Sequence, residues 1–121
     1  MDTNQKLAQF ENRVRQAATD VFPHTVLSVT ERGRYRLKIR VELSNKTFID
    51  IFYNPKNDRT DFALIHESQR IFGYDNLGGW HRHSVEDPQT HTPCDEPLCD
   101  QVFQEMKAIF DVSLESSSGH S

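Results

Sequence analysis

The feature that most constrains the fold is a segment in which apolar and charged residues alternate almost without exception. Between residues 34 and 43, alternate positions are apolar, and the positions between them are charged. The apolar set is Tyr35, Leu37, Ile39, Val41 and Leu43, and the charged set is Arg34, Arg36, Lys38, Arg40 and Glu42. Because the side chains of a strand point alternately to two faces, this pattern predicts a β-strand with one buried and one solvated face.

The flanking segments continue the same period of two. Residues 24–54 predict three strands, with turns at Glu31-Arg32-Gly33 and Ser44-Asn45-Lys46. Residues 60–76 predict a second hairpin that turns at Ser68-Gln69. The sequence therefore predicts about five antiparallel strands.

Two segments have helical spacing instead. Apolar residues in 3–22 recur every three or four positions, and Pro23 supplies a stop. Residues 95–112 show a second apolar stripe, with Asp95 as the N-cap and Pro97 in the first turn. We predict an α+β fold, a single antiparallel sheet of about five strands with an N-terminal and a C-terminal helix packed on one face. We expect residues 1–112 to form this single domain and residues 113–121 to form a disordered Ser-rich tail.

The overall composition excludes several classes of protein. The chain has 121 residues, enough for one core, and a net charge of -4, which argues against a generally basic coat for binding duplexes. The polar N-terminus does not resemble a signal peptide, and no apolar run approaches membrane length, so we expect a cytoplasmic protein that does not enter a membrane. In that compartment the two cysteines are expected to be thiols or metal ligands.

Residues 74–97 concentrate reactive side chains in one irregular stretch. His81, His83, His91 and Cys94 are of the types that zinc accepts, and their short spacings allow a loop to close around an ion. The spacing is not that of a standard zinc finger. The alternative is a polar loop whose histidines form hydrogen bonds with the backbone and hold the loop in place.

The same histidines suggest acid–base chemistry. His81 and His83 can act as base and acid in metal-independent cleavage of RNA, while Arg36, Arg40 and Arg82 hold the phosphate. Further candidates for nucleic-acid binding are Arg34 and Lys38 on the charged strand face, Arg70 in the second hairpin, and Trp80, which can stack on bases. This hypothesis requires the arginines to lie within about 15 Å of the histidines. The alternative is an ordinary solvated strand face.

The order of these motifs resembles the TumE-like family of small toxins from prokaryotic toxin–antitoxin pairs. The matching residues are Tyr74-Asp75-Asn76 at the end of a strand, then Trp80-His81-Arg82-His83, then Pro88, His91 and Pro93. The resemblance implies growth inhibition, a cognate antitoxin as partner, and action on RNA or translation. It also makes candidates of the matched positions, which are Asp75, Asn76, His81, His83 and His91. The resemblance covers roughly residues 24–110. The chain departs from the family pattern at Arg82, which separates two histidines that are often adjacent in the family, and at Cys94 and Cys99, a pair that the family usually lacks.

Two other functions fit the sequence. In one, the protein is a non-catalytic binding module whose docking loop is stabilised by zinc or pinned by histidines. In the other, it is a subunit of a homo-oligomer that pairs through edge strands of the sheet.

Overall fold

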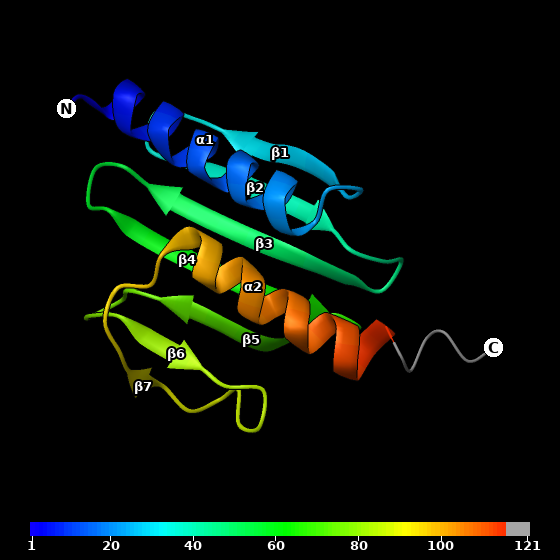
Figure 1. Ribbon diagram of the computed structural model, residues 1–121. Helices are drawn as coiled ribbons and strands as arrows, with labels where there is room; N and C mark the ends of the chain where they lie inside the picture. Colours follow the sequence, from blue (N-terminus) through cyan, green and yellow to red (C-terminus); the bar gives the residue numbers. More distant parts are fainter. Residues whose placement is uncertain (116–121) are drawn as a thin grey trace.

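The fold was analysed in a computed structural model, which describes residues 1–115. Its centre is one seven-stranded sheet in which the strands follow one another in sequence order and every neighbouring pair is antiparallel (Figure 1). The strands are β1 (Val26–Arg32), β2 (Leu37–Glu42), β3 (Thr47–Asn54), β4 (Arg59–His66), β5 (Gln69–Asp75), β6 (His81–His83) and β7 (Thr92–Pro93).

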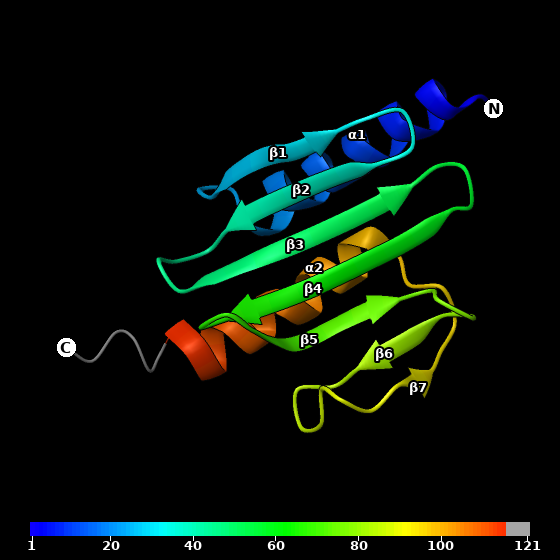
Figure 2. The same cartoon turned by 180° about the vertical axis from the view of Figure 1, so that it is seen from behind.

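Two α-helices cover one face of this sheet. They are α1 (Thr3–Val21) and α2 (Cys99–Ile109), and α2 continues into a π-helical segment, η1 (Phe110–Glu115). Seen from behind, the strands lie in front of both helices, so within residues 1–115 neither helix covers the second face (Figure 2). The predicted α+β fold with one antiparallel sheet and two helices on one face is confirmed, but the sheet has seven strands rather than about five.

The two additional strands lie in the stretch that was predicted to be irregular. β6 is only three residues long, and β7 only two. Such short strands exist because they pair with β5 and with each other, at Asp75↔His81 and His81↔Pro93, for example. The pattern within a short segment does not reveal which other strand that segment will pair with. The glycines and prolines around β6 and β7 therefore led to the prediction of a loop.

The N-terminal helix was predicted accurately, whereas the second helix starts later than expected. Asp2 and Gln5 form a capping box at the start of α1, which ends at Val21 before Pro23. At α2 the N-cap is Leu98, not Asp95, and the cap has no side-chain hydrogen bond. A proline disfavours the helical conformation of the residue before it, so Pro97 prevents the helix from including Glu96.

Two hairpin turns are displaced from their predicted positions. The first spans residues 33–36 and is closed by a 2.8 Å hydrogen bond from the Gly33 N–H to the Arg36 carbonyl oxygen, so Arg34 lies in the turn rather than in a strand. The second turns at Glu67-Ser68, where φ is 50° and 68°. The predicted turn at residues 44–46 is confirmed.

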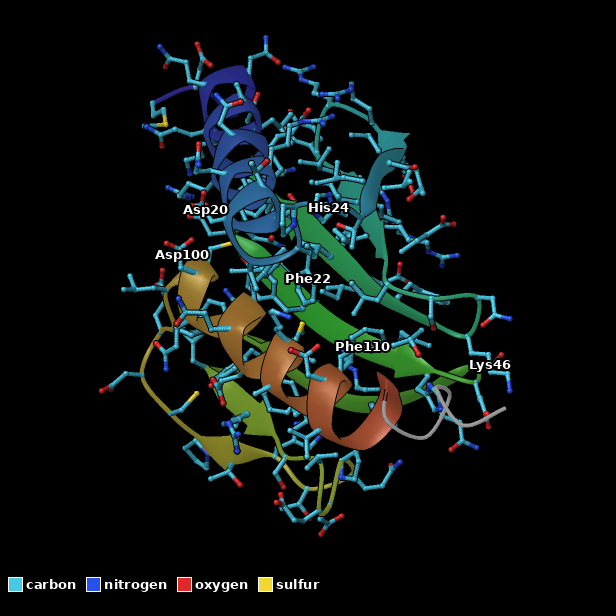
Figure 3. All side chains as sticks on the ribbon, turned by 45° about the vertical axis from the view of Figure 1, so that its right-hand side comes forward. Asp20, Phe22, His24, Lys46, Asp100 and Phe110 are labelled. Carbon is cyan, nitrogen blue, oxygen red and sulfur yellow. The ribbon has the colours of Figure 1, made fainter. Side chains whose placement is uncertain are left out.

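The core lies between the helices and the covered face of the sheet. The alternating residues Leu37, Ile39 and Val41 of β2 are buried there, as predicted. Phe22, the C-cap of α1, packs against Phe103 of α2 with ring centroids 6.2 Å apart, and its side chain lies between the two helices (Figure 3). The helices thus contact each other as well as the sheet.

Part of the predicted tail lies outside the described residues. η1 runs to Glu115, and the remainder of the predicted disordered segment, residues 116–121, is not described. Neither helix within residues 1–115 combines the length and apolar composition that crossing a bilayer requires.

Candidate functional site

The second, uncovered face of the sheet carries a cleft at the β4–β5–β6 end. Its volume is about 420 Å³. Charged and imidazole side chains line it from three strands and from the loop between β6 and β7. These residues, here called the histidine cleft, are Arg59, Asp61, Arg70, Asp75, His83 and His91, and Leu77, Pro88 and Gln89 complete the lining.

Strand register explains why these side chains share a face. Residues directly opposite in an antiparallel pair point to the same side, and Asp61 pairs with Asp75, which in turn pairs with His81. His83 lies two residues after His81 and so points the same way. Gly73 is paired with His83 and has no side chain, so the imidazole can lean across it towards Asp75.

His83 and Asp75 form a buried pair at the base of the cleft. The distance from His83 Nε2 to Asp75 Oδ2 is 2.6 Å, and both residues are about 95% removed from solvent. His83 Nδ1 lies 3.1 Å from the Pro88 carbonyl oxygen. Because a carbonyl and a carboxylate both accept, the ring satisfies both contacts when both of its nitrogens carry protons.

Asp75 is stabilised as a carboxylate in spite of its burial. Burial alone disfavours the charge, but the hydrogen bonds from His83 and from the Leu77 N–H outweigh it and lower the pKa of Asp75 below its ordinary value. The Leu77 N–H donates to Asp75 Oδ1 at 3.1 Å, so the two carboxylate oxygens have separate partners.

Asp61 and Asp75 face each other across neighbouring strands, and Arg70 lies between them. The Arg70 guanidinium forms a hydrogen-bonded ion pair with Asp61, and its Nη1 lies 3.8 Å from Asp75 Oδ2. Burial nevertheless raises the pKa of Asp61, and the Asp75 charge adds to this effect while Arg70 opposes it. Arg70 is therefore a bridging cation whose charge is already used within the protein.

Arg59 is the cleft cation whose side chain makes no direct contact with a carboxylate, although its charge acts on Asp61 at longer range and favours the carboxylate there. Its Nε is buried and has no hydrogen-bond partner among the described residues, and no carboxylate of that part of the chain forms an ion pair with it. A buried guanidinium nitrogen without an acceptor is costly, and an anionic ligand would satisfy it.

His91 brings a third imidazole to this group. Its ring centroid lies 4.3 Å from that of His83 and 5.7 Å from that of His81. His91 is exposed, whereas the Nδ1 of His81 is buried and unpaired among the described residues. The three predicted histidines are thus brought together, although His81 does not line the cleft.

Arg82 and Trp80 lie on the opposite side of the sheet. Since Arg82 alternates with His81 and His83, it points to the helices, where it forms an ion pair with Glu105 of α2 at 2.8 Å. Tyr74 donates a hydrogen bond to the same Glu105. Trp80 packs against the core on this side and lines a different cavity with Phe10 and Cys99. The structure does not place either predicted nucleic-acid contact beside the histidines.

The basic face of β2 is on the same side as the histidine cleft but distant from it. Four strand spacings of about 4.8 Å separate β2 from β6, which is about 19 Å and more than an arginine can span. Arg40 forms two hydrogen bonds with Asp50 at 2.9 and 3.1 Å. Arg36 and Lys38 both pair with Glu31, and Arg34 lies over the ring of Tyr35. Arg36, Lys38 and Arg40 are therefore paired with nearby carboxylates, and Arg34 lies in the β1–β2 turn.

Asn76, Cys94 and Cys99 do not line the histidine cleft. The Asn76 side chain accepts from the Thr60 N–H and donates to the Asp58 carbonyl oxygen, both at 2.8 Å, which fastens the β3–β4 turn to the end of β5.

Burial raises the pKa of Cys94, and raises that of Cys99 to about 12, which disfavours the thiolate that binds metals.

Three side chains form the one group of potential metal ligands found among the described residues. They are Asp75, His83 and His91, whose ligand atoms lie within 4.8 Å of one another. The predicted ligand set shares His83 and His91 with this group, which contains Asp75 but neither His81 nor Cys94. Arg59 and Asp61 were not predicted for any site, and they share a face because they lie two residues apart in β4.

The fold and the cleft define a small single-sheet α+β protein with a histidine–aspartate–arginine site on its uncovered face. The sequence pattern that describes the family Toxin TumE matches residues 10–110, and the chain belongs to this family. It is thus a toxin of the kind that is paired with a cognate antitoxin, as the resemblance implied. Searches of curated proteins and of solved structures each found no match.

Proposed function

We propose that this toxin acts on RNA by cleaving its phosphodiester backbone in the histidine cleft. The observation that carries the proposal is Arg59, which lines the same cleft as His83 and His91 and whose side chain has no hydrogen-bond or ion-pair partner within residues 1–115. A guanidinium that lacks an acceptor is suited to a phosphate oxygen, and imidazoles beside a phosphate are suited to the chemistry of its ester bonds.

The electrostatics of the cleft support an anionic ligand. The cleft carries two arginines, Arg59 and Arg70, and two carboxylates, Asp61 and Asp75. Both carboxylates lie against Arg70, so Arg59 brings positive charge to the rest of the lining, although the whole chain has a net charge of -4. Local charge of this kind attracts a polyanion to one place on an acidic protein.

The roles of the side chains follow from their environments. Arg59 binds the phosphate. Arg70, which is held between two carboxylates, positions Asp61 and Asp75. His83 and His91 are the reactive groups, and His91 is the one that substrate can reach from solvent.

The test is a comparison of growth arrest and RNA cleavage between matched variants. Arg59→Ala and Arg40→Ala each remove one arginine from the same face of the sheet, and Arg40 lies about 19 Å from β6. We expect Arg59→Ala and His91→Ala to slow cleavage of a labelled single-stranded RNA by roughly 100-fold or more and to relieve growth arrest. Arg40→Ala should behave like the wild type in both assays. Equal activity of Arg59→Ala and the wild type, with both folded by circular dichroism, would contradict the proposal.

One observation favours a second function, that of a binding module with a histidine-pinned docking loop. The bond from His83 Nδ1 to the Pro88 carbonyl oxygen fastens the loop between β6 and β7 to the sheet. If the loop only docks a partner, the purified toxin will leave RNA intact, and His91→Ala will weaken binding of the cognate antitoxin instead.

A further inference from the structure

We propose that Asp75, His83 and His91 bind one transition-metal ion of the zinc class. The proposal concerns the same cleft as the proposed function and rests on it only for the role of the metal, because metal binding can be measured without RNA. The site would be built from one carboxylate and two imidazoles, with a remaining coordination position that faces the cleft.

The three donors already lie close to a coordinating arrangement. Their ligand atoms are all within 4.8 Å of one another, and His83 Nε2 and Asp75 Oδ2 are 2.6 Å apart. Around a tetrahedral ion with bonds of about 2.0 Å, neighbouring ligand atoms lie about 3.3 Å apart. Coordination therefore requires shifts of about 1.5 Å or less, and the largest falls on His91, which lies in a loop at the surface.

Hydrogen bonds orient the side chains of His83 and Asp75 in the way that is usual for metal ligands. His83 donates from Nδ1 to the Pro88 carbonyl oxygen, which fixes the ring and aims Nε2 at the site. Asp75 Oδ1 accepts from the Leu77 N–H, while Oδ2, which Arg70 Nη1 approaches only to 3.8 Å, is the oxygen for the ion. A ligand histidine usually donates its second ring nitrogen to a backbone carbonyl or a carboxylate in this way, and ligand carboxylates are also hydrogen-bonded.

The ion would lie where His83 Nε2 and Asp75 Oδ2 now make a hydrogen bond of 2.6 Å, and would take the place of its proton. Binding of the metal replaces this proton, which is released to solvent, so that one cation exchanges for another between the same two atoms. His91 completes the set, because neither of its ring nitrogens has a hydrogen-bond partner within residues 1–115. Its lone pair is therefore available without breaking an existing contact.

The nature of the donors selects the ion. Two imidazoles and one carboxylate suit zinc and related divalent transition metals, whereas magnesium prefers oxygen ligands and water. With the ion bound, His83 and His91 would be ligands rather than acid and base. The ion would take over their role in the proposed function, because it would add positive charge beside Arg59 and supply a Lewis acid to a phosphate bound there.

The experiment is isothermal titration calorimetry of the full chain, purified without a histidine tag and stripped with EDTA. We expect Zn²⁺ to bind at one ion per chain, and Mg²⁺ not to bind. His91→Ala should weaken Zn²⁺ binding by at least about tenfold, since losing a ligand costs more than losing a supporting contact. His91 is exposed, so this variant is expected to fold, which circular dichroism will verify.

Two further variants separate this site from other sources of zinc binding. His24→Ala removes an exposed histidine beside Pro23, far from the cleft along the chain, and should bind Zn²⁺ like the wild type. Cys94→Ser should also bind like the wild type, because the thiol is not one of the three ligands. Absence of Zn²⁺ binding by the wild type, or equal affinity in His91→Ala, would overturn the proposal, as would loss of binding in Cys94→Ser alone.

Different results would reject the metal site and RNA cleavage. Zinc bound with the expected dependence on His91, by a protein that leaves RNA intact, supports the metal site and rejects RNA cleavage. RNA cleaved at an undiminished rate by EDTA-stripped protein that binds no Zn²⁺ supports the cleavage and rejects the metal site.

Discussion

His83 Nε2 lies 2.6 Å from Asp75 Oδ2, and this pair joins the end of β5 to β6 below the surface of the cleft. The contact links a position in the Tyr74-Asp75-Asn76 motif to one in the His-x-His motif. Two parts of the sequence that both resemble the toxin family are therefore one structural unit. The pair holds β6, a strand of only three residues, in the register that places His81 and His83 on the uncovered face.

Asp75→Asn is expected to destabilise the protein by about 3 kcal/mol, because it leaves His83 buried without its charged partner. Asparagine keeps an oxygen that can accept from the Leu77 N–H, so the turn itself is retained. Urea unfolding followed by circular dichroism measures the loss. A change below about 0.5 kcal/mol, the range of ordinary surface substitutions, would show that the pair contributes nothing to stability.

The stability that Asp75 contributes should depend on pH in the acid range. Because the fold lowers the pKa of Asp75 below its ordinary value of 3.8, this contribution is complete above that pH. It is lost as the pH falls through the lower pKa of the folded state. We expect the free energies of unfolding of wild type and Asp75→Asn to converge below pH 3.8 in a series of urea titrations. A constant difference down to pH 2 would be inconsistent with a lowered pKa.

Gly73→Ala tests the closest approach between two strands of the sheet. A Cβ at this position would lie 2.2 Å from the Phe62 carbonyl oxygen, which cannot move without disturbing the β4–β5 ladder. We expect a loss of at least about 2 kcal/mol in the free energy of unfolding. Gly33→Ala is the matched control, since its Cβ would meet only the Arg36 carbonyl oxygen at 3.7 Å. Similar stabilities of the two variants would contradict the predicted clash.

Arg82→Ala separates the two faces of β6. Loss of the partly exposed ion pair with Glu105 should cost about 1 kcal/mol, and RNA cleavage by the folded variant should remain at the wild-type rate. Its neighbour His83 is only one residue away but belongs to the cleft. A fall in cleavage as large as that of Arg59→Ala would place Arg82 in the substrate site after all.

Much of the fold could be predicted from the sequence. The alternation from Arg34 to Leu43 specified a strand and its buried face, and the spacing in residues 3–22 specified a helix that ends before Pro23. These signals are local, because each strand or helix carries its own periodicity. The family motif was also local, and the match to Toxin TumE over residues 10–110 confirms the resemblance.

The sequence predicted only some of the side chains that lie together at the candidate site. His81, His83 and His91 were expected to lie together and do so. The predicted phosphate contacts were not placed beside them. Arg82 points to the helices because β6 is a strand, and the alternation of its three residues separates the arginine from the histidines on either side. A loop, as predicted, would not have imposed this separation.

The sequence by itself determined the two helices, the first five strands, their buried faces and the family, because hydrophobic periodicity and motif spacing are properties of short segments. Only the tertiary structure decided which cation stands beside the histidines. Arg59 reaches the cleft through the pairing of β4 with β5 and of β5 with β6, and His91 reaches it through the loop that His83 pins at Pro88. Such pairings join residues that are distant in the chain, and they depend on backbone hydrogen bonds and cross-strand side-chain contacts that no short segment contains by itself.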